Sequence, residues 1–368
     1  MPPRIAPIPV CGPRRTYALP FAVAFASVLL AGCGGGGGPG TAHHAALPSK
    51  VAVKEFTVPG GGREGEGTGT GPLGITAGPD GNLWFTEQYR NSLVSLTRSG
   101  RFAEYAMGRD TNPQGIALGP DGRLWFTEYT GNKVGAITRR GAFQEYTLPS
   151  ATADKYSIGS VGIAAGPDGK IWFTELLRNR IGSITRSGKI TEYTVPTPNS
   201  GVHGITAGPD GNLWFTEETG GKIGSITPAG TITEYPASYD DSYPSDITLG
   251  PDGRLWFTDG NQFLIGAVTP SGSFTTYQIP PPELAHDITP GPDGNLWFTT
   301  FSTLNHHKIG AISPDGTVAE YDFPTSKTES PWGITQGPDG NLWFTTDYHI
   351  GEVVLASKAA SHVTQTPK

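Results

Sequence analysis

The sequence predicts an all-β fold, a seven-bladed β-propeller of four-stranded blades closed by an N-terminal outer strand that completes the last blade. Three observations predict it. First, a motif Gly-Pro-Asp-Gly-x-Leu/Ile-Trp-Phe-Thr recurs with 41–47 residues between its tryptophans, which are Trp84, Trp125, Trp172, Trp214, Trp256, Trp297 and Trp343. Second, each interval holds short strand-like runs and no helix-length pattern. Third, the last copy lacks a fourth run, and a matching segment, 54–59, precedes the first copy.

Each repeat reads as a meander of four strands. In the fourth copy the expected strands are 204–207, 213–216, 222–227 and 231–235. The Gly-Pro-Asp-Gly turn at 208–211 joins the first two, because proline pre-sets the first corner, aspartate favours the second and glycine tolerates the left-handed position. The flanking runs are rich in β-branched and aromatic residues, which favour strands. Segment 54–59 is therefore expected to close the ring and remove two exposed sheet edges.

The N-terminal residues do not follow the repeat. Residues 1–33 combine arginines with an apolar stretch at 17–30, which is shorter than the ~20 residues of a membrane-spanning helix and is typical of a secretory signal. The stretch ends in Leu-Ala-Gly-Cys33, which resembles a bacterial lipobox, so we expect an exported protein anchored in the cell envelope by a lipid on Cys33. Cleavage by an ordinary signal peptidase nearby is the alternative. Residues 34–50 read as a flexible tether, 51–357 as the propeller and 358–368 as a polar tail.

The charge of the chain excludes one class of partner. The formal net charge is −7, and it becomes −10 without residues 1–32, since three arginines and no acids are lost. No basic patch is evident, so we expect no nucleic acid partner. The expected membrane contact is the lipid anchor alone, and a closed ring without free edges gives no reason to expect an oligomer.

One face of the ring is expected to vary. The Gly-Pro-Asp-Gly turns and the Ser-Gly or Ala-Gly turns share one face and are short. The opposite face, here called the variable face, carries the longer segments 151–160 and 302–307. Five histidines map to it: His203, His286, His306, His307 and His349. Variable loops on a rigid scaffold are a common place for binding.

Two sets of positions on the variable face are candidates for a site. The residue before the Gly-Ile or Asp-Ile step of each first strand changes from blade to blade and is expected at the mouth of the central channel: Leu73, Gln114, Val161, His203, Ser245, His286 and Trp332. The second strands end in Glu87, Glu128, Glu175, Glu217, Asp259, Thr300 and Thr346. The carboxylates among them suit either a Mg²⁺ or Ca²⁺ site or a scaffold role, in which they bond loop amides.

The repeat Gly-Ile-Thr-Ala-Gly-Pro-Asp-Gly-Asn-Leu-Trp-Phe-Thr-Glu, followed by Lys-Ile-Gly-x-Ile-Thr and Thr-Glu-Tyr, resembles the virginiamycin B lyase (streptogramin lyase) family over about 300 residues. The resemblance implies a seven-bladed propeller that opens cyclic esters by elimination, with Mg²⁺ and a histidine base. It places the base at His203 and a metal ligand at Glu217. Gly201 and Val161 stand where the family has a further acid and a second histidine.

Three functions remain open from the sequence. In the first, a Mg²⁺-dependent lyase, His203 is the base, His286 replaces the missing histidine, and Glu217 and Glu175 hold the metal. In the second, a non-catalytic surface propeller binds a sugar, peptide or protein. Its contact residues would be Gln114, Trp332, His306, His307 and Tyr348. The third is a metal-dependent hydrolase of lactone-like substrates, which differs from a lyase in the chemistry of its product.

Overall fold

The computed structural model describes residues 46–60, 71–138, 140–150, 159–237, 239, 241–302, 304 and 306–355. The predicted signal peptide, Cys33, most of the tether and the tail lie outside these residues, as does most of segment 151–160. Contacts divide the chain into units 1–41 and 42–368, and every described residue belongs to the second. Within the described ranges, no helix is both long and apolar enough to cross a bilayer.

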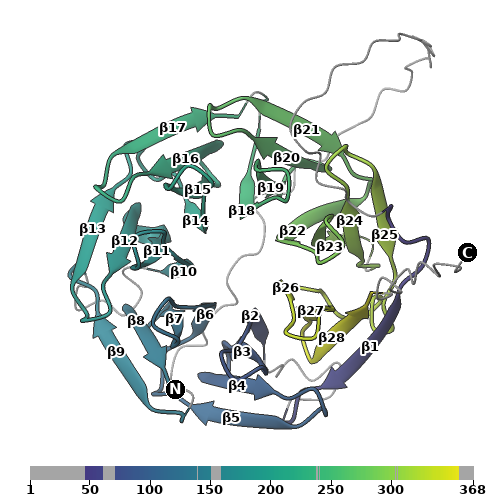
Figure 1. The fold of residues 1–368 in the computed structure, drawn as a ribbon, viewed down its shortest axis with the longest axis horizontal. Helices are drawn as coiled ribbons and strands as arrows, with labels where there is room; N and C mark the ends of the chain where they lie inside the picture. The colour runs from purple at the N-terminus through teal and green to yellow at the C-terminus, as the bar shows by residue number, and fades with distance from the viewer. Residues whose placement is uncertain are drawn as a thin grey trace, which may run out of the picture. The chain divides into compact units, whose positions relative to one another are not determined.

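Seven four-stranded antiparallel sheets surround a central opening, which confirms the predicted seven-bladed propeller (Figure 1). The first strand of each blade lies innermost and the fourth lies at the rim. The blades are numbered in chain order.

The first three blades contain twelve strands and one short 3-10 helix. Blade 1 is β2 (Pro72–Ala77), β3 (Leu83–Glu87), β4 (Ser92–Leu96) and β5 (Phe102–Ala106). Blade 2 is β6 (Pro113–Leu118), β7 (Leu124–Glu128), β8 (Lys133–Ile137) and β9 (Phe143–Thr147). Blade 3 is β10 (Ser160–Ala165), β11 (Ile171–Glu175), η1 (Leu176–Arg178), β12 (Arg180–Ile184) and β13 (Ile190–Thr194).

The remaining blades complete the ring. Blade 4 is β14 (Val202–Ala207), β15 (Leu213–Glu217), β16 (Lys222–Ile226) and β17 (Ile232–Pro236). Blade 5 is β18 (Pro244–Leu249), β19 (Leu255–Asp259), β20 (Leu264–Val268) and β21 (Phe274–Gln278). Blade 6 is β22 (Glu283–Pro290), β23 (Leu296–Ser302), β24 (Ile309–Ile312) and β25 (Val318–Tyr321). Blade 7 is β26 (Ile334–Gln336), β27 (Leu342–Thr345), β28 (His349–Val354) and β1 (Ala52–Thr57).

The N-terminal strand closes the ring as predicted. β1 pairs antiparallel with β28 over its whole length. Phe56 stacks on Trp343 with ring centroids 5.5 Å apart, and Val58 is only 2% exposed. Glu55 accepts hydrogen bonds from the backbone amide and the hydroxyl of Thr325, which follows blade 6. The two ends of the described chain are therefore held in one sheet.

The repeated motif builds the core between blades. In blade 4, Trp214 is fully buried, stacks on Tyr235 at 5.2 Å and donates its Nε1–H to Asp210 of the turn at 3.1 Å. Gly211 of that turn has φ 81°, which a side chain would strain. Any Cβ on Gly208 would lie 2.4 Å from the Trp214 ring. The turn aspartate is thus also the partner that satisfies the buried indole.

A belt of threonines joins each blade to the next. Thr216 accepts from the backbone amide of Gly204 in its own blade at 2.8 Å and donates to the carbonyl of Ser245 in blade 5 at 2.7 Å. The same pair of bonds recurs at Thr86, Thr127, Thr174, Thr258, Thr299 and Thr345. Thr345 bonds Leu73 of blade 1, so the belt is continuous around the channel.

Replacing Thr216 with valine is expected to lower the free energy of unfolding by about 2–4 kcal/mol, because two buried backbone groups lose their partners. Valine matches the shape of threonine, so packing is conserved. Urea unfolding of the variant measures the loss, and Thr216→Ser, which keeps the hydroxyl, should recover most of it. A valine variant as stable as the parent would show that the belt contributes nothing.

A β-bulge near the start of the first strand positions the channel residues. In blade 4, Val202 pairs with Glu217 and Ile205 with Phe215, so His203 and Gly204 oppose a single residue. The same register shift occurs in all of the first six blades. Bulges re-aim side chains and locally disrupt strand pairing. In blade 6 the strands β22 and β23 are longer than their counterparts, so part of the predicted loop 302–307 is strand.

Candidate functional site

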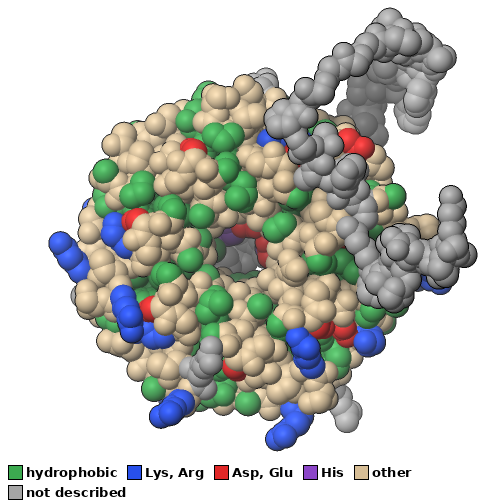
Figure 2. Space-filling model, in the orientation of Figure 1, with side chains coloured by type: hydrophobic (Ala, Val, Ile, Leu, Met, Phe, Trp, Pro, Cys, Tyr) green, Lys and Arg blue, Asp and Glu red, His purple; other side chains and the backbone are tan. Residues whose placement is uncertain are grey.

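The innermost strands line the channel with different side chains in different blades. At this position, which is the bulge in blades 1–6, the seven blades carry Leu73, Gln114, Val161, His203, Ser245, His286 and Trp332, so the histidines and the indole belong to blades 4, 6 and 7. The residue that follows is glycine in five blades but Asp246 in blade 5 and Asp287 in blade 6. Acidic and histidine side chains are visible inside the central opening in Figure 2. The polar chemistry is therefore concentrated on one half of the ring.

His203 is oriented by a backbone contact. Its Nδ1 lies 3.2 Å from the carbonyl oxygen of Ser245. Since a carbonyl only accepts, Nδ1 carries the proton and Nε2 holds a lone pair. The side chain is 26% exposed, and Glu218 Oε1 lies 3.7 Å from Nδ1. This contact orients the ring and leaves Nε2 outside the bond to Ser245.

His286 is the second channel histidine and is more enclosed. Burial lowers its pKa to about 4, with a further lowering by His203 and an opposing effect of Asp246. Its Nδ1 is shut off from solvent and has no hydrogen bond of normal geometry among the described residues, although the backbone of Trp332 acts to raise its pKa. Its ring meets Trp332 edge to face at 5.3 Å. The predicted residues His203, His286 and Trp332 are thus brought together.

Asp246 and Asp287 are the site residues that sequence reasoning missed. The amide of Ile288 donates to Asp287 Oδ1 at 2.8 Å and to Asp246 Oδ2 at 3.3 Å. Asp287 Oδ2 accepts from the amide of Ile334 in blade 7 at 2.8 Å. Burial, then the charge of Asp246 and their mutual hydrogen bond, raise the pKa of Asp287 well above its ordinary value. The sequence did contain a signal for these residues: both are aspartates at a position that is glycine in the other five blades.

The acids that end the second strands face the blade interior. Glu128, Glu175 and Glu217 have no exposed surface. Asp259 accepts from Ser242 and from the amides of Tyr243, Asn261 and Gln262. Those amide contacts agree with the alternative that Asp259 has a scaffold role, in which it bonds loop amides.

In blades 6 and 7 the hydroxyl and the carboxylate have swapped places relative to blade 5. There Thr300 or Thr346 follows the Trp-Phe-Thr motif in place of the acid, and its hydroxyl donates to a glutamate three residues before His286 or Trp332, namely Glu283 or Glu329. In blade 5 that loop position is Ser242, which donates to Asp259. The hydroxyl–carboxylate pair thus recurs in blades 5, 6 and 7. In blades 6 and 7 the glutamate supplies the carboxylate, so the threonine can replace the acid after the second strand's Trp-Phe-Thr motif.

The predicted Mg²⁺ ligands Glu217 and Glu175 lie on neighbouring blades, and Ser150 donates to Glu175. Both oxygens of Glu217 lack a hydrogen-bond partner in the described part of the chain, although Ser200 is near enough to lower its pKa slightly. Over the residues that the structure describes, no three His, Cys, Asp or Glu side chains are placed to hold a metal. Mg²⁺ binding by Glu217 and Glu175 therefore stays a prediction.

Glu128 makes the stability of the protein depend on pH. Burial, with the charge of Glu145, raises its pKa from 4.5 to about 8, and neither oxygen has a hydrogen-bond partner among described residues. Because the folded pKa is the higher one, stability is fully present below pH 4.5 and is lost as pH rises through 8. Glu128→Gln should leave stability at pH 5 unchanged and raise it by about 2–4 kcal/mol at pH 9. Urea titrations at both pH values test this, and equal shifts at the two would contradict it.

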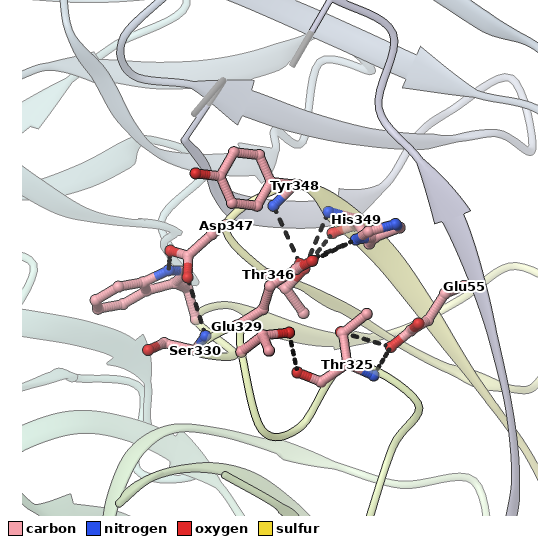
Figure 3. A network of polar contacts seen from close by, with 10 residues as sticks. Glu55, Thr325, Glu329, Ser330, Thr346, Asp347, Tyr348 and His349 are labelled. Carbon is pink, nitrogen blue, oxygen red and sulfur yellow. Dashed lines mark hydrogen bonds and ion pairs between the residues drawn. The ribbon is translucent and has the colours of Figure 1, made fainter. Parts of the chain in front are cut away.

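A polar network connects Trp332 to the outer loops of blade 7 (Figure 3). Asp347 accepts from Trp332 Nε1 and from the amide of Ser330, both at 3.0 Å. Glu329 accepts from Thr346, from the amide of Tyr348 and from His349 Nδ1 at 2.8 Å. The network fixes the indole beside the channel.

The other predicted contact residues are spread over the variable face. His307 is buried, accepts from the amide of Ser302, and has its pKa lowered by burial. His306 lies farther out, 41% exposed, with Nε2 3.2 Å from Asp322. Gln114 is 9% exposed and donates to Gln88 and Asn112. His307 Nε2 lies 3.5 Å from the hydroxyl of Ser330, in the network that holds Trp332, whereas Gln114 belongs to blade 2.

Apolar side chains stand at the tips of the variable-face loops. Four of the large exposed hydrophobic residues lie between the second and third strands of blades 1, 3, 5 and 6: Tyr89, Leu177, Phe263 and Leu304, with 66%, 50%, 39% and 73% exposed.

Comparison with known proteins agrees with this geometry. The model of the Virginiamycin B lyase family matches residues 54–356. A streptogramin B lyase structure shares 37% identity and a TM-score of 0.76, covering 83% of this chain and 98% of its own. The virginiamycin B lyase of Staphylococcus aureus shares 36% identity and a TM-score of 0.75, covering 83% and 100%. A catalytically inactive histidine-to-alanine variant of it with quinupristin gives the same values. No curated protein matches. The chain belongs to the virginiamycin B lyase family.

Proposed function

We propose that this protein opens a cyclic ester by elimination at the channel opening on the variable face, with His203 as the base. The observation that carries the proposal is the contact of His203 Nδ1 with the carbonyl of Ser245, which leaves Nε2 basic and partly exposed. The names of the two similar structures indicate the substrate class to test first, a streptogramin B antibiotic.

The elimination balances without water. His203 Nε2 takes a proton from the carbon next to an activating carbonyl, and the freed electron pair forms a carbon–carbon double bond. The bond between the neighbouring carbon and the ester oxygen breaks, and its electron pair stays on that oxygen as a carboxylate. The ring opens and the linear product has the mass of the substrate.

A second function is supported by the exposed loop tips. Tyr89, Leu177, Phe263 and Leu304 offer exposed apolar contacts on four blades, which suit the capture of a ligand without chemistry. The protein would then bind the cyclic compound, or a surface peptide or sugar, and release it unchanged.

The deciding experiment is incubation of the purified protein with quinupristin, once with Mg²⁺ and once with EDTA, followed by mass spectrometry. A linear product of unchanged mass in both conditions supports the proposal. A product heavier by one water indicates hydrolysis, and activity lost with EDTA assigns the chemistry to a metal. Unaltered quinupristin favours the binding function and overturns the enzymatic one.

We also propose that the protein is exported and lipid-anchored through Cys33, a residue outside the described ranges. The support is the Leu-Ala-Gly-Cys33 sequence after the apolar stretch. Labelling of cells with a radioactive fatty acid should mark the parent and not Cys33→Ser; a labelled serine variant would overturn the assignment.

A further inference from the structure

The turns that join the third strand of a blade to the fourth share one backbone structure. They lie on the face opposite the variable face, which is called the turn face below. In each of blades 1–6, the amide of the turn glycine donates to the carbonyl of the threonine or serine three residues earlier. This distance is 2.9 Å from Gly188 to Thr185 in blade 3 and 2.8 Å from Gly230 to Thr227 in blade 4. Differences in side chains among these turns are therefore not required by the backbone.

Blades 1–3 carry basic residues in these turns, and blades 4–6 do not. The turn 185–189 of blade 3 reads Thr-Arg-Ser-Gly-Lys, whereas the turn 227–231 of blade 4 reads Thr-Pro-Ala-Gly-Thr. Blades 5 and 6 likewise have proline before the glycine and serine or threonine after it, at 269–273 and 313–317. The exposed cations of the first three blades are Arg98, Arg101, Arg140, Arg186 and Lys189. They are called the basic arc below.

The basic arc is not used to hold the fold together. Among the residues that the structure describes, none of its five side chains is ion-paired with a carboxylate, and Arg98 donates to the backbone carbonyl of Pro338 at 2.6 Å. A neighbouring cation, Arg123, instead pairs with Asp121 of its own turn at 2.8 Å. Figure 2 shows Lys and Arg side chains over blades 1–3, at the bottom and left of the view, and few over blades 4 and 5 at the top. One half of the turn face therefore presents positive charge to an external partner.

The segment that leads from Cys33 reaches the propeller on the same face. Strand β28 runs from the variable face to the turn face, and Ala52 at the start of β1 pairs with Val354 at its end. Just before β1, the carbonyl of Pro48 accepts from the hydroxyl of Tyr321 at 2.6 Å. The chain from Cys33 to Pro48 can span at most about 50 Å when fully extended. A lipid on Cys33 would thus attach the protein to a membrane through the turn face, at blade 7, which lies beside blade 1 (Figure 1).

We propose that the basic arc binds the anionic phospholipid headgroups of the membrane that holds the lipid of Cys33. Negatively charged headgroups attract each lysine or arginine near the surface, and binding is strengthened about fivefold per residue. The position of the tether selects this partner among anionic ones, because it keeps the turn face close to the membrane. No basic patch was visible in the sequence, since each of these turns belongs to a different repeat.

Binding by the basic arc would orient the propeller. The turn face would lie against the membrane, and the variable face with His203 and His286 would point away from it, toward dissolved substrates. The proposal goes beyond the proposed function and adds a contact with headgroups to the expected contact through the lipid. It does not depend on whether the protein catalyses a reaction.

The test compares vesicles of phosphatidylcholine alone with vesicles that also contain phosphatidylglycerol. The purified full chain is sedimented with each kind, and the ratio of the two partition coefficients is measured in low and in high salt. Apolar segments and any attached lipid enter both kinds of vesicle, so the ratio reports the headgroup charge. The parent should prefer the anionic vesicles in low salt and lose this preference in high salt, because salt screens the attraction.

The deciding variant combines Arg101→Thr with Lys189→Thr. Threonine already stands at this turn position in blades 4 and 6, as Thr231 and Thr317, so the variant should fold. Its ratio should be about 20-fold lower than that of the parent, at about fivefold for each lost charge. Should it not fold, the same two positions changed to glutamine decide the question.

The matched control combines Arg109→Thr with Lys327→Thr. These are exposed cations between a fourth strand and the next first strand, on the variable face, and the change in charge is the same. The control should keep the parental ratio. An equal loss in both variants would show that only the net charge matters and would overturn the proposal, as would a parental ratio in the turn variant. Equally tight binding of a single-stranded oligonucleotide would assign the arc to polyanions in general and also overturn it. No turnover is measured, so failure of the enzymatic proposal leaves this test unaffected.

Discussion

Replacing His203 with glutamine is expected to lower kcat for elimination by about 100-fold or more, because the proposed base is lost. Glutamine retains an N–H that can reach the carbonyl of Ser245, so the bulge and the stability should be preserved. KM should change little if the imidazole acts on the reacting proton rather than on binding. Steady-state kinetics with quinupristin and a thermal melt of the same sample provide both readouts.

His306 is the matched control for this variant. It lies on the same face, is 41% exposed and pairs with Asp322. His306→Gln should keep the parental kcat. Unchanged turnover in His203→Gln would exclude His203 as the base and direct attention to His286, whose pKa of about 4 keeps it neutral at physiological pH.

The fold was predictable because its signals are local and repeated. The motif around Trp214 specifies its local structure: the proline and glycine make the turn, and Asp210 accepts a hydrogen bond from the indole four residues later. Each such unit needs a neighbour to cover its tryptophan, so the number of copies determines the number of blades. The missing fourth strand of the last copy likewise identified 54–59 as its replacement, and β1 fills that place.

The site was only partly predictable because its chemistry depends on contacts between blades. His203 could be found from its motif, but its bond to Ser245 could not. Asp246 and Asp287 looked equivalent to glycine within an Asp-Ile or Gly-Ile step. Only the structure shows that both carboxyl groups accept from amides of the next blade. The contact between Thr346 and Glu329 in blade 7 was not predicted either, because the two residues are distant in sequence.

Deleting residues 46–59 is expected to abolish the folded propeller. The deletion removes β1, leaves the edge of β28 unpaired and uncovers Trp343, against which Phe56 stacks. Burial of Val58 and Phe56 is worth up to about 1.5–3 kcal/mol each. With the strand hydrogen bonds, the loss is comparable to the 5–15 kcal/mol of a typical domain.

The deletion has a clear control and a rescue. A chain that lacks only residues 1–45 retains β1 and should melt cooperatively, like the full chain, in circular dichroism. Adding a peptide of residues 46–60 to the longer deletion should restore part of the folded signal, because an added strand can pair with the free edge of β28. A longer deletion that melts at the parental temperature would show that six blades and a three-stranded seventh are sufficient, and that the N-terminal strand contributes little to holding the ring closed.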